Sequence, residues 1–257
     1  MSAVTLRPRS TWLMIRNGFT VARTPAILIA AGSGVAFILY VLTSIGGGSP
    51  AFHLTVYPIM LVLLGFIVSS FAFQEIHDSR AGIYELTSPG SILEKYVARI
   101  LLTSVGWTLA VTVAYMLTTL LGAGLSTLVI GHSHGIFVPN SRVIWEIIGS
   151  YLVTQSIFVF GSIFFKKSAF LKTVLMAVAF AIVFAIFFAI AGRVIYWGEF
   201  ARILPSEAEI NALIEAFGPN DQAVMERVAR VFDYLNWTLV PVFFWLAGYV
   251  RLRETEV

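Results

Sequence analysis

Three histidines are the residues with the clearest capacity for chemistry. His132 and His134 lie in the sequence Gly-His-Ser-His-Gly, and His53 lies in an earlier loop that we expect on the same side of the membrane. An extended His-x-His segment places both imidazoles on one side, so the three could form an outward-facing metal or pH-sensitive site. No acidic residue or cysteine lies nearby as a further ligand, and a polar loop is the alternative interpretation.

A second stretch, from residue 74 to residue 96, gathers charges of both signs around apolar anchors. Ser88-Pro89 breaks this stretch, and Ser91-x-x-Glu94 is a capping box that opens a helix. A short amphipathic helix, a break and a capped helix form an elbow suited to docking a cytoplasmic partner, whereas the alternative is a solvated connector. The candidate docking residues are Glu75, His77, Asp78, Arg80, Tyr84, Glu85, Glu94 and Lys95.

No set of residues predicts catalysis. Gly32-Ser33-Gly34 and Gly161-Ser162 lack a His or Asp at matching depth to activate a serine, so we interpret them as helix-packing sites. The sequence has no Walker A motif and no cysteine. We therefore expect no enzyme activity and no cofactor bound by this chain.

The composition is that of a membrane protein. Of the 257 residues, 58% are hydrophobic and only 12% are charged, and the mean hydropathy is +0.86. Soluble domains carry about 25% charged residues, so a soluble enzyme, a disordered chain and a disulfide scaffold are excluded. The net charge of +3 does not indicate nucleic-acid binding here, because the charges are distributed by membrane topology.

The elements that must position these residues are apolar helices, since about 20 apolar residues cross a bilayer. The sequence predicts an all-α fold with six spans, at about residues 25–43, 55–73, 100–121, 143–165, 173–192 and 237–250. Their centres carry no ionisable residue, with Glu146 and Arg193 near the ends. This pattern disfavours a proton- or sodium-coupled carrier, an ion pump and a membrane-embedded enzyme.

Lys and Arg gather at the N-terminus, in the loops at 74–99 and 166–172, and at the C-terminus. The positive-inside rule then places both termini in the cytoplasm, in a multi-pass protein of the cell (inner or cytoplasmic) membrane. Residues 10–24 have an apolar face at helical spacing, which predicts an interfacial helix; an ordinary charged flank is the alternative. The first apolar run begins late in the sequence, so we do not expect a cleavable signal peptide.

The stretch 193–236 is too long for a plain connector. Ser206-Glu207-Ala208-Glu209 predicts one capped amphipathic helix, ended by Gly218-Pro219, and a second helix begins at Asn220 or Asp221. We expect an external cap of two helices on a single transmembrane domain that includes residues 1–257.

This order of parts resembles the membrane subunit of ABC-2-type transporters. The local resemblance lies in Leu86-Thr87-Ser88-Pro89-Gly90-Ser91-Ile92-Leu93-Glu94-Lys95-Tyr96, after the second span. It implies that the elbow is a coupling helix on an ABC ATPase subunit, which holds ATP and Mg, and that a second permease subunit, identical or different, completes an exporter in the lipid bilayer. The long external loop departs from better-known members. The alternative function is a non-transporting sensor or assembly component whose external cap binds a ligand or partner.

Overall fold

The computed structural model describes residues 23–74, 91–195 and 219–255, and the regular elements in these ranges are all helical. Contacts divide the chain into two compact units, residues 1–170 with 240–257, and residues 171–239. The helices are α2 (Arg23–Ser44), α3 (Ala51–Pro58), α4 (Leu64–Phe71), α6 (Ile92–Leu101), α7 (Trp107–Val129), α8 (Arg142–Phe164), α9 (Ala169–Ile195) and α11 (Pro219–Thr255), with π-helical turns η1 (Ile59–Leu63) and η3 (Leu102–Gly106).

Five helices of the described ranges are long and apolar enough to cross a membrane, which is the pattern of a multi-pass membrane protein. They are the stretches 24–44, 51–71, 92–129, 142–164 and 169–191, and each matches one of the first five predicted spans. The sixth predicted span, 237–250, lies within α11, which is not among the five.

The external cap is described only in part. Its first predicted helix lies outside the described residues, as does most of the predicted interfacial helix at 10–24. The second predicted cap helix differs from expectation, because α11 runs from Pro219 to Thr255 as one helix of 37 residues. The predicted second cap helix and the predicted sixth span are therefore parts of a single element.

The third membrane helix begins at the predicted capping box, before the apolar span predicted from about residue 100. From Ile92 to Val129 the chain is helical over 38 residues, through α6, η3 and α7. At 1.5 Å per residue this is about 57 Å, whereas the hydrocarbon core of a bilayer is about 30 Å thick. The helix therefore extends beyond the core, which explains how its first turns can carry Glu94, Lys95 and Arg99.

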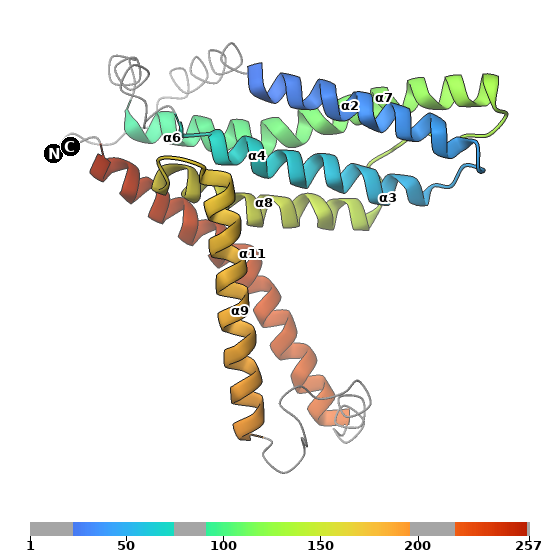
Figure 1. Ribbon diagram of the computed structural model, residues 1–257. Coiled ribbons are helices and arrows are strands. Elements are labelled where there is room, and N and C mark those ends of the chain that lie inside the picture. The colour runs from blue at the N-terminus through green and yellow to red at the C-terminus, as the bar shows by residue number, and fades with distance from the viewer. Residues whose placement is uncertain (1–22, 75–90, 196–218, 256–257) are drawn as a thin grey trace. The chain divides into compact units, whose positions relative to one another are not determined.

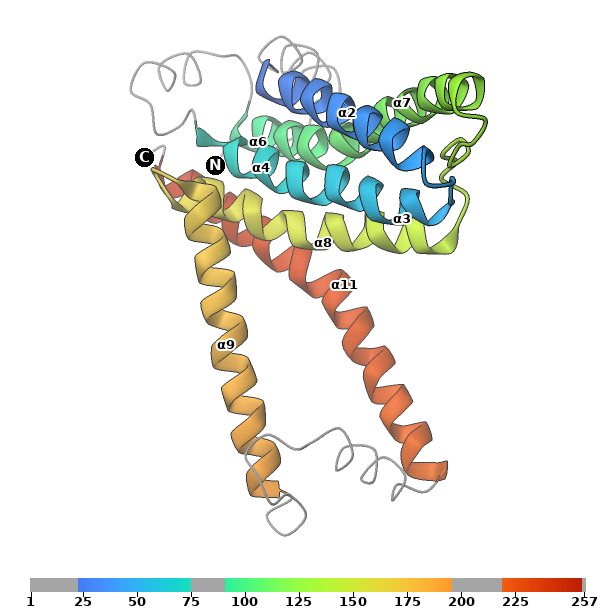
Figure 2. The same cartoon turned by 45° about the vertical axis from the view of Figure 1, so that its right-hand side comes forward.

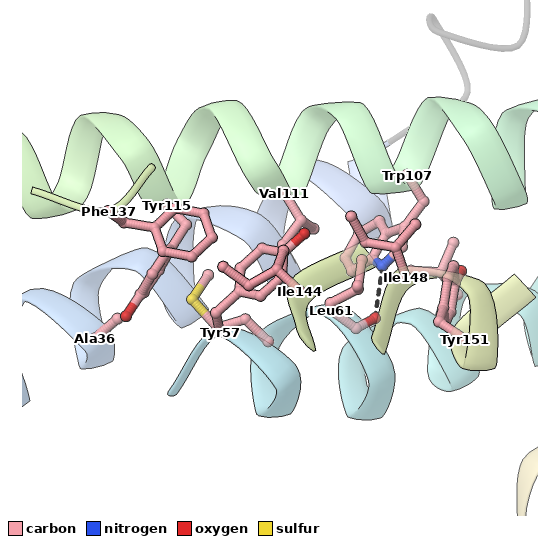
Figure 3. Packing of buried hydrophobic residues seen from close by; sticks show 12 residues of the cluster. Ala36, Tyr57, Leu61, Trp107, Val111, Tyr115, Phe137, Ile144, Ile148 and Tyr151 are labelled. Atoms are coloured by element: carbon pink, nitrogen blue, oxygen red, sulfur yellow. Dashed lines mark hydrogen bonds between the residues drawn. The ribbon is translucent and has the colours of Figure 1, made fainter. Parts of the chain in front are cut away.

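In the larger unit, α2, α3 to α4, α6 to α7 and α8 lie side by side in both views (Figures 1 and 2). α2 packs against α7, and α4 packs against α8. The buried side chains between them form a row from Phe137 and Tyr115 to Trp107 and Tyr151 (Figure 3). A largely aromatic seam therefore holds four membrane-spanning segments together.

Both π-helical turns lie on this seam. The Trp107 indole N–H, directly after η3, donates to the Leu61 carbonyl oxygen of η1 at 3.0 Å (Figure 3). A π-helical turn frees backbone groups from the ordinary helical pattern, and Pro58 before η1 lacks an N–H. A Cβ on Gly65 would lie 2.6 Å from Trp107 Nε1 and 2.5 Å from Tyr151 Cε2, so only glycine fits beside these rings.

The smaller unit contains most of α9 and the first part of α11. α9 is the most apolar of the five candidate spans. Phe180, Phe184 and Phe188 follow one another at four-residue spacing along it, with neighbouring ring centroids 4.8 and 6.0 Å apart. Such i, i+4 aromatic contacts stabilise an apolar helix along one face.

Candidate functional site

The candidate site is the base of the elbow, where its two ends enter the larger unit. Six of the eight candidate docking residues lie outside the described residues: Glu75, His77, Asp78, Arg80, Tyr84 and Glu85. The flanks of the elbow, which end at Gln74 and resume at Ser91, are described. The packing of these flanks shows which helices the two ends of the elbow contact.

The predicted capping box at Ser91 is confirmed. Ser91 Oγ accepts from the backbone N–H of Glu94 at 3.3 Å, and Glu94 Oε2 accepts from the backbone N–H of Ser91 at 3.0 Å. Only 3% of Glu94 is exposed, so its carboxylate stabilises the start of α6 and is not presented on the surface. Lys95 is half-buried on the same turn.

The two flanks of the elbow contact each other directly. The rings of Phe73, directly before the elbow, and Tyr96, its last residue, have centroids 5.4 Å apart. Arg99 donates to the carbonyl oxygen of Ala72 and lies 5.3 Å from the centre of the Phe73 ring. A cation over an aromatic face is attractive, most of all where water is excluded. These contacts fasten the end of α4 to α6.

The same contacts extend to two more helices. We use the name base cluster for the buried residues Phe73, Tyr96, Val159, Ile163 and Leu252, which come from the α4 end, α6, α8 and α11. The Tyr96 hydroxyl donates to the Trp245 carbonyl oxygen at 2.6 Å. A Cβ on Gly248 would lie 2.6 Å from the same hydroxyl oxygen, so glycine lets α11 approach α6 closely.

The base cluster joins the ends of four helices. It consists of two packed rings and three aliphatic side chains, with the Arg99 cation beside the Phe73 ring, and it contains no nucleophile with an adjacent base. Closely packed interiors transmit displacement because they have little free volume. The ends of α4, α6, α8 and α11 are packed against one another at the base cluster.

At the other end of the larger unit, the candidate histidines His53 and His134 lie side by side and are buried. His53 Nε2 donates to the backbone carbonyl oxygen of His134 at 3.2 Å, and its Nδ1 lies 3.2 Å from the Tyr115 hydroxyl. Since a carbonyl oxygen only accepts, the ring proton of His53 is on Nε2, and Nδ1 accepts from Tyr115.

Both ring nitrogens of His134 are engaged as well. Thr43 Oγ1 donates to the Leu39 carbonyl oxygen at 2.6 Å and accepts from His134 Nε2 at 2.8 Å. His134 Nδ1 lies 2.8 Å from the Ser49 backbone nitrogen, whose N–H can donate to it, and 3.0 Å from the Ser49 carbonyl oxygen. These hydrogen bonds fix the loop between α7 and α8 onto α2 and the start of α3.

The three candidate metal ligands do not form one group. His132 is exposed, and among the described residues no group of three or more His, Cys, Asp or Glu side chains is placed to bind a metal ion. Each ring nitrogen of His53 and His134 already has a hydrogen-bond partner, so a metal ion bound there would have to replace one of these bonds. The geometry supports a structural role for this pair.

Sequence reasoning missed a buried polar group in the middle of the bundle. Tyr151 donates to the Thr103 carbonyl oxygen at 2.7 Å, and Gln155 Nε2 donates to Thr103 Oγ1 at 2.8 Å, while Gln155 Oε1 is buried without a hydrogen-bond partner. The signal in the sequence is a glutamine within a predicted span, because an amide in hydrocarbon needs hydrogen-bond partners.

The chain matches no protein-family model, no curated protein and no solved structure.

Proposed function

We propose that this chain is the transmembrane permease subunit of an ABC-2-type ABC transporter, an exporter whose energy comes from a separate ATPase subunit. The observation that carries the proposal is the base cluster, because both ends of the predicted docking elbow enter it. Phe73 and Tyr96 lie in contact at the two ends of the elbow, and Tyr96 is hydrogen-bonded to α11. An elbow with this base is suited to pass movement of a partner to several membrane helices.

The absence of charge from the centres of the predicted spans supports the same proposal. Ion-coupled carriers and pumps need ionisable groups within the membrane. A transporter whose energy comes from a subunit outside the bilayer does not need such groups. The proposed complex contains an ABC ATPase subunit with ATP and Mg, and a second permease subunit in the lipid bilayer.

Charge reversal in the elbow tests the proposal. The triple variant Glu75→Lys, Asp78→Lys and Arg80→Glu should abolish co-purification of the ATPase subunit while the protein still inserts into the membrane. The matched control exchanges Arg142 and Glu146, an exposed ion pair in a segment predicted on the opposite side of the membrane, and should leave co-purification unchanged. A fully active complex with the triple variant would overturn the docking assignment. If the wild-type protein captures no ATPase at all, the sensor or assembly alternative is favoured.

A further inference from the structure

A groove of about 330 Å³ runs between α8 and the segment formed by α3, η1 and α4. The wall from α3, η1 and α4 is apolar and carries Pro58, Val62 and Phe66. The α8 wall is mixed, with Glu146, Ser150 and Thr154 beside Val143, Ile147 and Tyr151. The first wall contains the proline and the π-helical turn η1, whose wider backbone departs from a regular helix surface. The groove is therefore built into the larger unit and is independent of the proposed function.

The two walls differ in chemistry. Glu146, Ser150 and Thr154 are spaced four residues apart on α8 and share one face. The Thr154 hydroxyl donates to the Ser150 carbonyl oxygen at 2.9 Å. Polar groups facing hydrocarbon cost free energy unless a partner accepts or donates hydrogen bonds. The groove thus favours an occupant that is apolar along one side and polar at one end.

Glu146 lines one end of the groove, and its ion-pair partner Arg142 lies beside the groove, one turn earlier on α8, without lining it. Arg142 Nε donates to Glu146 Oε1 at 2.7 Å, and the two side chains are 91% and 54% exposed. Trp145 is exposed on the same turn of α8, as is common where a membrane helix reaches the interface. The ion pair is therefore at a depth where it can meet a lipid head group.

We propose that this groove binds a zwitterionic phospholipid from the leaflet at the N-terminal end of α8. The head-group ammonium contacts Glu146 and its phosphate contacts Arg142, while part of one acyl chain lies along Val62 and Phe66. The ammonium is paired with the Glu146 carboxylate and the phosphate with the Arg142 guanidinium, so each charge of the head group faces an opposite charge. An anionic head group without the ammonium would place uncompensated negative charge beside Glu146. The volume of the groove is near the lower end of the range for ligand pockets, so the groove can hold part of one acyl chain.

The test compares retention of two lipids with identical acyl chains. The purified full-length protein is equilibrated with equal amounts of phosphatidylethanolamine and phosphatidylglycerol, and bound lipid is measured by native mass spectrometry. Wild-type protein should retain phosphatidylethanolamine about two- to fivefold over phosphatidylglycerol, the ratio expected from an exposed charge interaction. Glu146→Gln should abolish or reverse this preference, because Arg142 then attracts the anionic lipid.

Two controls separate the groove from general effects. Glu254→Gln removes the acid of another exposed ion pair, that with Arg251, and should keep the wild-type ratio. Ser150→Phe fills the groove and should lower phosphatidylethanolamine retention to that of phosphatidylglycerol, whereas Leu128→Phe, at a side chain 87% exposed on α7, should not. Equal retention of both lipids by wild-type protein, or an unchanged ratio in Glu146→Gln, would overturn the proposal.

Discussion

Tyr96 donates its hydroxyl proton to the backbone carbonyl oxygen of Trp245, which is 2.6 Å away in space and 149 residues away along the chain. Tyr96 lies in the first turns of α6, at the end of the elbow, and Trp245 lies in α11. The bond therefore connects the segment that we propose to dock a partner with a helix far from it in sequence.

Replacement Tyr96→Phe should weaken this connection without changing the ring packing. We expect a loss of about 1 kcal/mol in the free energy of unfolding, the usual net value of one hydrogen bond. Thermal unfolding of the purified protein measures it. The matched control is Tyr234→Phe, because Tyr234 is 73% exposed in the same chain. Equal melting temperatures for the two variants would show that the bond to Trp245 contributes nothing.

Gly65→Ala should displace the rings of Trp107 and Tyr151, both of which are held by hydrogen bonds to carbonyl oxygens. Overpacking of this kind costs about 1–3 kcal/mol. Gly34→Ala is the control, because a Cβ there meets no atom within 4 Å. Thermal unfolding and tryptophan fluorescence report the change. A Gly65→Ala protein as stable as Gly34→Ala would contradict the close contact.

His134→Ala should remove the bonds to Thr43 and Ser49 and leave two polar groups without this partner. We expect destabilisation by about 1–3 kcal/mol, against no measurable change for the exposed His132→Ala. Differential scanning calorimetry of both variants makes the comparison.

Addition of zinc distinguishes the structural role of the histidines from metal binding. A ligand at 100 times its dissociation constant stabilises a protein by about 2.7 kcal/mol. Because both ring nitrogens of His53 and of His134 are engaged, zinc should not raise the melting temperature of the wild-type protein. A rise that His53→Ala abolishes would restore the metal site.

Ser168 has a φ of 55°, the left-handed region that glycine adopts at little cost. Ser168→Gly should therefore raise stability by up to about 1 kcal/mol, whereas Ser168→Val should lower it, because a β-branched side chain is strained there. Chemical unfolding of both variants provides the measurement. The opposite order would mean that this turn is not under backbone strain.

The all-helical class and five of the spans could be predicted from the apolar runs, because a long hydrophobic stretch identifies a membrane helix directly. The Ser91–Glu94 cap was also predictable, since it depends on residues three positions apart. The same cap marks the start of the third membrane helix, which the structure continues from Ile92 to Val129, so the charged residues Glu94, Lys95 and Arg99 lie on helical turns before the apolar run. Charge marks the membrane boundary and not the helix end.

The contacts of the site were not predictable from the same pattern. His53 was expected in a loop but lies in α3, whereas His134 lies in a loop as expected. Both contact partners from other helices, and nothing local in the sequence specifies those pairings. The bond from Tyr96 to Trp245 likewise depends on which helices are neighbours. A single sequence gives the periodicity of a helix but not which helix it contacts.

The π-helical turn at Ile59–Leu63 has a consequence for insertions and deletions in this protein. A π-helical turn corresponds to one extra residue in an α-helix. Deleting one residue there should restore an ordinary helix and keep Tyr57 and Gly65 facing the same neighbours. One residue deleted from a regular part of α7 would instead rotate everything beyond it by about 100°. The segment 59–63 is therefore the place where this membrane helix can change length and keep its alignment.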